Sequence, residues 1–481
     1  MPMMPGGTNP PERPLARVTL FYLATMAAAI AFFFAVRHWG AGLVAPASTA
    51  VADTAGRAGG ASPHVLWHLL LALATVVIAG RAVSWLFRSI GQPPVIGEVV
   101  AGILLGPSLL GYVWPQASAY LLPADVAPFL GMLAQLGVIV YMFLVGLELN
   151  GDMLRGHLRT TLTTSHTSIA VPFMLGSAFA LYLYPRFSSA NVPFTHFALF
   201  LGVAMSITAF PVLARILSDQ RMTQTRIGAL SLTCAAIGDV TAWCLLAFAV
   251  GVVNGSAQNA VFVGLFTVAF IALMFLVVKP RFERLAHAVN GEQPTQRAVS
   301  ITLIALLLSA LATEAIGVHA IFGAFLLGAV IPHESVLARS LHKGIVDLVT
   351  ILFMPAFFAF TGMRTQIGLL SGSYEWLVCL AVIAVAVIGK FGGTAVAARL
   401  NGLDMRHSMA LGVLMNTRGL MEVIVLNVGL DLGVIAPTLF TMLVVMAIVT
   451  TLMTIPLLKV VLPAASWRAE SAVAGSAVRA S

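Results

Sequence analysis

Four ionisable side chains lie inside long apolar stretches of this sequence, and they are its strongest candidates for chemistry. Asp239 ends the run Ser231-Leu-Thr-Cys-Ala-Ala-Ile-Gly-Asp, about 13 residues or roughly 20 Å of helix beyond Arg226. Lys390 lies at a similar depth in Val387-Ile-Gly-Lys-Phe-Gly-Gly. Opposite charges at one depth predict an ion pair between Asp239 and Lys390, and a purely structural salt bridge is the alternative interpretation.

The other two charges belong to the motif Asn416-Thr417-Arg418-Gly-Leu-Met-Glu422. Arg418 and Glu422 are four residues apart, so they can pair along one helix face, which would be a structural role. The Asn, Thr and Gly residues beside them predict instead a break in the helix, which frees backbone polar groups. Irregular backbone is tolerated at membrane depth where protein or a water-filled cavity surrounds it.

A second break is predicted at Ser206-Ile-Thr208-Ala-Phe-Pro211. Pro211 removes one backbone hydrogen bond, and the hydroxyls of Ser206 and Thr208 are available nearby. Free carbonyls and hydroxyls are hard oxygen ligands of the kind that Na⁺ and K⁺ prefer. Ser206 and Thr208 are therefore candidate ligands, with Asp239 as the negative charge.

These residues lie in a chain that is too apolar for a soluble domain. Of its 481 residues, 59% are hydrophobic and 9% charged, and the mean hydropathy is +0.97. A membrane-spanning helix needs roughly 20 apolar residues. Such helices are predicted at 16–36, 64–88, 93–111, 127–149, 164–184, 195–217, 226–252, 259–279, 297–315, 319–332, 347–363, 376–400, 408–430 and 436–460.

The distribution of basic residues supports this count and gives the orientation. With residue 1 inside, most of the 26 Lys and Arg side chains fall on the inner side, and only Arg37, Arg57, Arg186 and Arg364 fall outside. The net charge of +8 therefore reflects membrane topology and not nucleic-acid binding. A multi-pass protein of the inner (plasma) membrane with a cytoplasmic C-terminus is predicted.

The order of the segments predicts an inverted repeat. If the second to seventh and the ninth to fourteenth segments form two six-helix halves around the eighth, the two predicted breaks occupy the same place in each half. Because six is even, the single intervening segment inverts one half relative to the other. Interrupted helices at matching positions of inverted repeats are the best sequence-level indication of a secondary-transporter site.

The remaining features are less specific. Residues 1–63 predict an extra N-terminal helix and a linker, with a signal-like segment as the alternative, and 462–481 a short tail with no attached nucleotide-binding regulatory domain. Glu98 is a secondary candidate, for which capping of a helix N-terminus is the ordinary explanation. The cysteines and histidines have no metal-ligand spacing, and no cofactor is expected.

Several motifs in fixed order resemble the monovalent cation/proton antiporter superfamily, in particular its branch of bacterial Kef-type transporters and plant cation/proton exchangers. They are Pro94-Val-Ile-Gly-Glu-Val-Val-Ala-Gly-Ile-Leu-Leu-Gly-Pro-Ser-Leu-Leu-Gly111, Phe143-Leu-Val-Gly-Leu-Glu148, Ser206-Ile-Thr-Ala-Phe-Pro-Val-Leu-Ala-Arg215, Gly238-Asp-Val-Thr-Ala-Trp243 and Met415-Asn-Thr-Arg-Gly-Leu-Met-Glu422. The resemblance covers 64–460, and the exchanger domain is assigned to 64–461.

The resemblance implies an all-α membrane protein with 13 core helices plus the extra N-terminal one, and with crossed broken helices. It also implies a homodimer, elevator-like alternating access, and competition of cation and proton for Asp239, with Lys390 as its ion-pair partner. Many relatives carry Asp, Asn or Gln before this aspartate, where this chain has Gly238.

The resulting hypothesis is a non-enzymatic antiporter that exchanges K⁺ or Na⁺ for protons across the lipid bilayer. One alternative is a Kef-type gated potassium efflux system, which would conduct without moving protons. A distant alternative is an intramembrane aspartyl protease, which needs a second aspartate at depth that the sequence does not offer.

Overall fold

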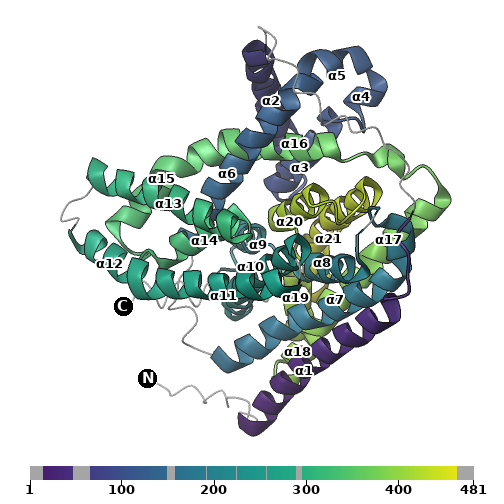
Figure 1. Ribbon diagram of the computed structural model, residues 1–481, viewed down its shortest axis with the longest axis vertical. Coiled ribbons are helices and arrows are strands. Elements are labelled where there is room, and N and C mark those ends of the chain that lie inside the picture. The colour runs from purple at the N-terminus through teal and green to yellow at the C-terminus, as the bar shows by residue number, and fades with distance from the viewer. Residues whose placement is uncertain are drawn as a thin grey trace, which may run out of the picture.

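The computed structural model describes residues 15–46, 65–148, 158–190, 192–223, 225–255, 257–288 and 295–462. Within these ranges the regular secondary structure is helical, apart from one isolated β-bridge between Ser188 and Ile435 (Figure 1). The predicted all-α class is confirmed.

The helices of the first half are α1 Leu15–Gly40, α2 Val65–Ser89, α3 Pro94–Leu105, α4 Leu110–Val113, α5 Pro115–Leu121, α6 Ala127–Glu148, α7 Leu158–Phe187, α8 Phe194–Ser206, α9 Phe210–Asp219 and α10 Arg226–Asn254. Those of the second half are α11 Ala257–Leu273, α12 Lys279–Ala288, α13 Gln296–Ile316, α14 Ala320–Val330, α15 Val336–Leu348, α16 Met354–Arg364, α17 Ser373–Val387, α18 Gly393–Leu400, α19 Met405–Met415, α20 Leu420–Asp431 and α21 Pro437–Val461. Single π-helical turns join α11 to α12, α15 to α16 and α17 to α18.

Within the described ranges, twelve stretches of helix are long and apolar enough to cross a membrane. Two of the predicted segments are not among them, for different reasons. The segment predicted at 319–332 forms α14, which has 11 residues. The one predicted at 408–430 is divided into α19 and α20, each too short to span alone. Helix length by itself therefore does not reproduce the predicted count.

The helices pack as two bundles. We call α2, α3, α6 and α13–α16 the scaffold bundle, and α7–α10 with α17–α21 the site bundle, because the extensive helix–helix contacts lie mainly within each set. In Figure 1, α2, α3 and α16 lie above α7 and α18. Between the bundles in sequence, α11 and α12 connect α10 to α13.

Glycines bring the backbones of the scaffold bundle into direct contact at two places. A Cβ atom at Gly102 of α3 would lie 2.1 Å from the Phe358 carbonyl oxygen of α16. A Cβ atom at Gly328 of α14 would lie 2.2 Å from the Phe143 carbonyl oxygen of α6. Because any side chain would overlap these oxygens, both contacts require glycine, as in close-packed membrane helices generally.

The N-terminal helix α1 lies along α7 (Figure 1). Phe33 of α1 packs against Phe173 of α7 with ring centroids 5.6 Å apart. Whether this segment is retained as an extra helix or is signal-like stays a prediction. The predicted tail lies outside the described residues except for Leu462, and most of the predicted linker does too.

Candidate functional site

Two buried cations cap the C-terminal end of α8. Arg418 donates from Nη1 to the carbonyl oxygen of Ala204 (3.1 Å) and from Nη2 to that of Met205 (2.6 Å). Lys390 donates from Nζ to the carbonyl oxygen of Ser206. These carbonyls have no partner within the helix, and they form the negative end of its dipole. Positive charge is therefore stabilised at the first break.

The two breaks contact each other through their backbones. Thr208 donates its hydroxyl to the carbonyl oxygen of Met415, the last residue of α19 (2.9 Å). The backbone N–H of Ala209 donates to the carbonyl oxygen of Thr417 (3.0 Å). Each break thus satisfies polar groups that the other exposes, which lets both exist inside an apolar bundle.

Local sequence explains where the interrupted helices restart. Pro211 lies in the first turn of α9, where a missing N–H costs no intrahelical hydrogen bond. Gly419 precedes α20 with φ 146° and ψ −130°, a conformation that is essentially restricted to glycine. Asn416 ends α19 as its C-cap residue.

Arg418 and Glu422 form the pair that their spacing predicts. The Nη1–Oε2 distance is 2.7 Å, and both side chains are fully buried. Glu422 lies in the first turn of α20, where negative charge is favourable. The backbone N–H of Arg418 also donates to the Thr451 hydroxyl of α21 (3.0 Å). This network holds the second break in place, which agrees with the structural interpretation of the pair.

Asp239 lies near the middle of α10, with 2% of its surface exposed. The backbone amide of Phe210, at the start of α9, interacts with its carboxylate. Its Oδ2 atom is buried without a hydrogen-bond partner. The carboxylate borders a cavity of about 10 Å³ lined by Ile207, Asp239, Ala242, Trp243, Met421 and Val425. That volume is roughly what one water molecule or one small dehydrated ion occupies.

Lys390 and Asp239 are brought into the same bundle but not into direct contact. No salt bridge joins the two among the described residues, and the ammonium group of Lys390 donates to Ser206 instead. Lys390 lies in the π-helical turn Ile388–Gly392, a deviation that is frequent at functional sites. The predicted ion pair is thus absent from this conformation and stays a prediction for another one.

The hydroxyls of Ser206 and Thr208 are buried and already donate to carbonyl oxygens. Ser206 donates to Gly202 (2.7 Å) and Ile169 (3.0 Å), and Thr208 donates to Met415. Each hydroxyl oxygen keeps lone pairs that are able to accept or to coordinate. The carbonyls at the end of α8, in contrast, already receive hydrogen bonds from Lys390 and Arg418.

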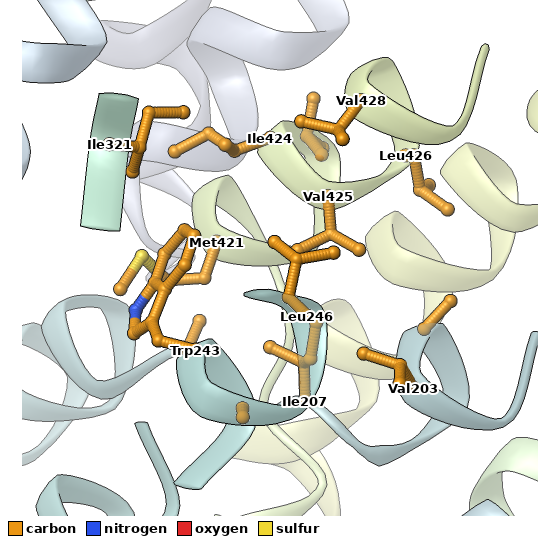
Figure 2. Packing of buried hydrophobic residues seen from close by; sticks show 14 of the residues in the cluster. Val203, Ile207, Trp243, Leu246, Ile321, Met421, Ile424, Val425, Leu426 and Val428 are labelled. Atoms are coloured by element: carbon orange, nitrogen blue, oxygen red, sulfur yellow. The ribbon is translucent and has the colours of Figure 1, made fainter. Parts of the chain in front are cut away.

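An apolar layer separates this site from the scaffold bundle. Figure 2 shows Trp243 and Leu246 of α10 in one apolar cluster with Ile207, the side chains of α20 and Ile321 of α14. The Trp243 ring also lies beside Phe325 of α14, with centroids 6.4 Å apart. The site bundle therefore meets the scaffold through interdigitated apolar side chains at the depth of Asp239.

Glu98 belongs to the scaffold bundle and is separate from this site. It lies on α3 and faces α2, where its Cγ atom is 4.0 Å from the position of a Cβ at Gly80. The N-terminus of α3 has no side-chain cap. The N-cap residue is Pro93 and Glu98 is the fifth residue of α3, so the structural role that the sequence suggests for Glu98 stays a prediction.

Sequence reasoning missed the threonines of α21 and a hydroxyl-rich part of α7. Thr451 accepts from the backbone N–H of Arg418 and donates to its carbonyl oxygen (2.7 Å). The α7 segment reads Thr160-Thr-Leu-Thr-Thr-Ser-His-Thr-Ser168, an unusual density of hydroxyls for a membrane helix. That density was the available signal. Across the described residues, His, Cys, Asp and Glu side chains form no cluster suited to a metal ion.

Comparison with known proteins identifies the family. The family model "Sodium/hydrogen exchanger, transmembrane" matches residues 65–460. The Na⁺/H⁺ antiporter NhaS4 of Synechocystis is 44% identical over 402 residues, which is 82% of this chain and 98% of that protein. Cation/H⁺ antiporter 17 of Arabidopsis thaliana is 39% identical, covering 82% of this chain and 48% of that protein.

A fungal relative and a solved structure agree with these matches. The K⁺/H⁺ antiporter 1 of Saccharomyces cerevisiae is 34% identical, covering 78% of this chain and 44% of that protein. The chain thus spans about half the length of these plant and yeast relatives. The sodium proton antiporter MjNhaP1 of Methanocaldococcus jannaschii has the same fold, with a TM-score of 0.58, 18% identity, and coverage of 85% of this chain and 99% of that one. This chain therefore belongs to the sodium/hydrogen exchanger family within the monovalent cation/proton antiporter superfamily.

Proposed function

We propose that this protein is a secondary antiporter that exchanges Na⁺ or K⁺ for protons, with both ions competing for Asp239. The observation that carries the proposal is the buried Asp239 carboxylate, which borders a cavity of about 10 Å³ beside two interlocked helix breaks. The names of its relatives, which include Na⁺/H⁺ and K⁺/H⁺ antiporters, support both ions as substrates.

Competition follows from charge. Deprotonated Asp239 takes the cation, with hydroxyl oxygens such as those of Ser206 and Thr208 as neighbours, whereas protonated Asp239 has no charge left for it. Pairing with Lys390 is the other way to neutralise the carboxylate. A bare carboxylate that entered the apolar layer would cost several kcal/mol, so the site crosses it only when neutralised. For that reason, movement of the cation is coupled to movement of protons.

The packing supports an elevator-type movement of the site bundle against the scaffold. The breaks, Asp239, Lys390 and Arg418 all belong to the site bundle, so they would move together. The apolar contact between Trp243 and Phe325 contains no hydrogen bonds that sliding would break. The glycine contacts described above, by contrast, hold the scaffold helices tightly to one another.

The same glycine contacts support two inverted six-helix repeats. In that scheme α3 corresponds to α14 and α6 to α16. The contact between α3 and α16 at Gly102 then maps onto the contact between α14 and α6 at Gly328. A homodimer, location in the inner membrane and a cytoplasmic C-terminus complete the proposal, as expected from the family resemblance and the distribution of Lys and Arg.

The alternatives find less support. An aspartyl protease needs a second aspartate at depth, and Asp239 is the only buried aspartate in the described part of the chain. A gated potassium channel is distinguished from an antiporter by its flux, because channel flux follows voltage without proton movement.

The test is proton flux in proteoliposomes that contain wild type or Asp239→Asn, with Na⁺ and K⁺ added in turn. We expect cation-evoked proton movement in the wild type and none in the variant. The cation concentration for half-maximal rate should rise about tenfold for each pH unit of acidification, in the range where protons occupy the site. Cation flux without proton movement, or exchange that survives in Asp239→Asn, would overturn the proposal.

A further inference from the structure

The first part of α7 carries an unusual number of buried hydroxyls. Thr161, Thr163, Thr164, Ser165, Thr167 and Ser168 are each no more than 5% exposed. Some of them have structural partners: the Asn401 side-chain amide, for example, donates to Thr163 (2.9 Å) and Thr164 (3.0 Å). The hydroxyls of Thr167 and Ser168 have no hydrogen-bond partner, and Ser165 contacts α10.

Contacts between α7 and α10 place Ser165 at the depth of Asp239. The Cys234 thiol lies 3.8 Å from the carbonyl oxygen of Thr161, and Ser165 donates its hydroxyl to the carbonyl oxygen of Cys234 (2.8 Å). Further along both helices, His166 Nε2 lies 3.5 Å from the Thr241 hydroxyl. The two helices therefore run parallel here, and Asp239 lies at the level of Ser165 to Ser168.

Gly238 leaves room for a methyl group where these two helices meet. A Cβ atom built at Gly238 would have one heavy-atom neighbour within 4 Å, the Ser165 hydroxyl oxygen at 3.6 Å. In the same bundle, a Cβ at Gly389 would lie 2.9 Å from the backbone of Pro172. Close helix packing explains the glycine at 389, but it does not explain the one at 238.

Three buried oxygens on α7 and α10 have no partner. The hydroxyls of Thr167 and Ser168 and the Oδ2 atom of Asp239 are all buried without a hydrogen bond. A helical serine ordinarily donates to the carbonyl four residues earlier, and Ser168 does not. A buried polar atom without a hydrogen bond costs free energy, and a bound cation would offset this cost by coordinating the oxygen. Ser165 and Ser168, three residues apart, lie on one face of α7.

We propose that Ser165 and Ser168 are further ligands of the transported cation, in the space that Gly238 leaves next to Asp239. This inference rests on the proposed antiport function and names ligands that complete its site. Hydroxyl oxygens together with one carboxylate are a hard donor set, which suits Na⁺ and K⁺. Because Ser165 donates its hydrogen to Cys234, its lone pairs are free to face a cation.

The experiment compares Ser165→Ala and Ser168→Ala with a matched control, Ser177→Ala. Ser177 is also buried on α7 and donates to the Ala198 carbonyl oxygen (3.3 Å), about 13 Å further along the helix. Antiport rates are measured in proteoliposomes against Na⁺ and K⁺ concentration at one pH. Loss of either ligand should raise the half-maximal cation concentration about tenfold, whereas Ser177→Ala leaves it within about twofold.

Gly238→Ala supplies an independent test through the backbone of α10. Its methyl group meets Ser165 at an ordinary contact distance, so the variant should fold, but it occupies the space proposed for the cation. We expect weaker stabilisation of the purified variant against heating by NaCl and KCl, with choline chloride as the reference salt. This readout requires no transport and remains available if a serine variant fails to fold.

The outcomes separate this inference from the proposed function. Unchanged half-maximal concentrations in Ser165→Ala and Ser168→Ala, or full cation stabilisation of Gly238→Ala, would overturn the ligand assignment and leave antiport through Asp239 standing. If the serine variants changed only the pH dependence of exchange, and not the half-maximal cation concentration, the ligand assignment would be overturned as well. Absence of cation-evoked proton flux in the wild type would instead count against the antiport function.

Discussion

Arg364 at the end of α16 forms a salt bridge with Asp431 at the end of α20, and so links the scaffold bundle to the site bundle. Arg364 also donates from Nη1 to the side-chain oxygen of Asn427 (3.0 Å), and Asn427 donates to the Thr361 hydroxyl (2.9 Å). This polar contact lies at one end of an interface that is apolar at the depth of Asp239.

We expect Arg364→Ala and Asp431→Ala each to destabilise the protein slightly. The two side chains are 26% and 41% exposed, so solvent screening limits the pair itself to about 0.2–1 kcal/mol. A double-mutant cycle on thermal unfolding measures this coupling. Additive effects of the two substitutions would show that the salt bridge contributes nothing to stability. Arg364→Ala should destabilise the protein more than Asp431→Ala, because it also removes the hydrogen bond to Asn427.

We expect Lys390 to stabilise the folded protein, because its ammonium group is the charged donor to the Ser206 carbonyl oxygen. Lys390→Met leaves the Ser206 carbonyl without its charged donor, at an expected cost of about 1–3 kcal/mol. Lys390→Arg keeps a donor and should lose less. The measurement is the thermal unfolding midpoint of the purified proteins in one detergent. A Lys390→Met protein as stable as the wild type would mean that removal of the buried charge offsets the lost hydrogen bond.

Asp404 should contribute a constant stability above its ordinary pKa. It caps α19, where Oδ2 accepts the backbone N–H groups of Arg406 (3.1 Å) and His407 (3.3 Å). Partial burial raises the pKa of Asp404, but hydrogen bonds from His407 and Arg406 outweigh it, so the net pKa is lowered from 3.8. A lowered folded-state pKa means that the contribution is present above about pH 4 and is lost on further acidification.

Asp404→Ala should therefore cost about 1 kcal/mol at neutral pH, the usual magnitude for loss of an N-cap. The difference from wild type should stay flat from pH 8 to 5 and shrink only in stronger acid. Thermal unfolding of both proteins across this range is the measurement. A difference that disappears near pH 6 would contradict the assignment to Asp404.

Gly362 should tolerate no side chain. A Cβ atom there would lie 2.0 Å from the Gly102 carbonyl carbon, so Gly362→Ala forces α16 away from α3. We expect a large loss of folded protein in detergent, as judged by size-exclusion chromatography. Gly344→Ala is the matched control, because a Cβ atom at Gly344 on α15 would meet nothing within 4 Å. Equal yields of the two variants would contradict the close contact.

Local chemistry explains what could be predicted from the sequence. Apolar length predicts the spans, Pro211 and Gly419 mark the restart of the two interrupted helices, and the i, i+4 spacing predicts the pair of Arg418 with Glu422. Each of these depends on residues that are near one another along the chain, so no knowledge of the packing was needed.

Long-range geometry explains what was missed. The partner of Lys390 is a backbone carbonyl 184 positions away, and sequence offers no way to choose it over the Asp239 carboxylate at similar depth. The length of α14 was overestimated because its apolar residues continue into the non-helical segment that follows. The α7 hydroxyls become candidate cation ligands only because the structure places Ser165 next to Gly238.

The apolar layer in Figure 2 is also an electrical insulator. Polar and hydrated regions of a membrane protein screen an applied voltage, whereas a thin layer of Ile, Leu, Val and Trp side chains does not. In the exchange that we propose, a charge that passes this layer would cross a region that screens the membrane potential little. Each elementary charge carried across gains or loses about 2.3 kcal/mol per 100 mV, so the net charge that passes the layer sets how strongly voltage biases the proposed exchange.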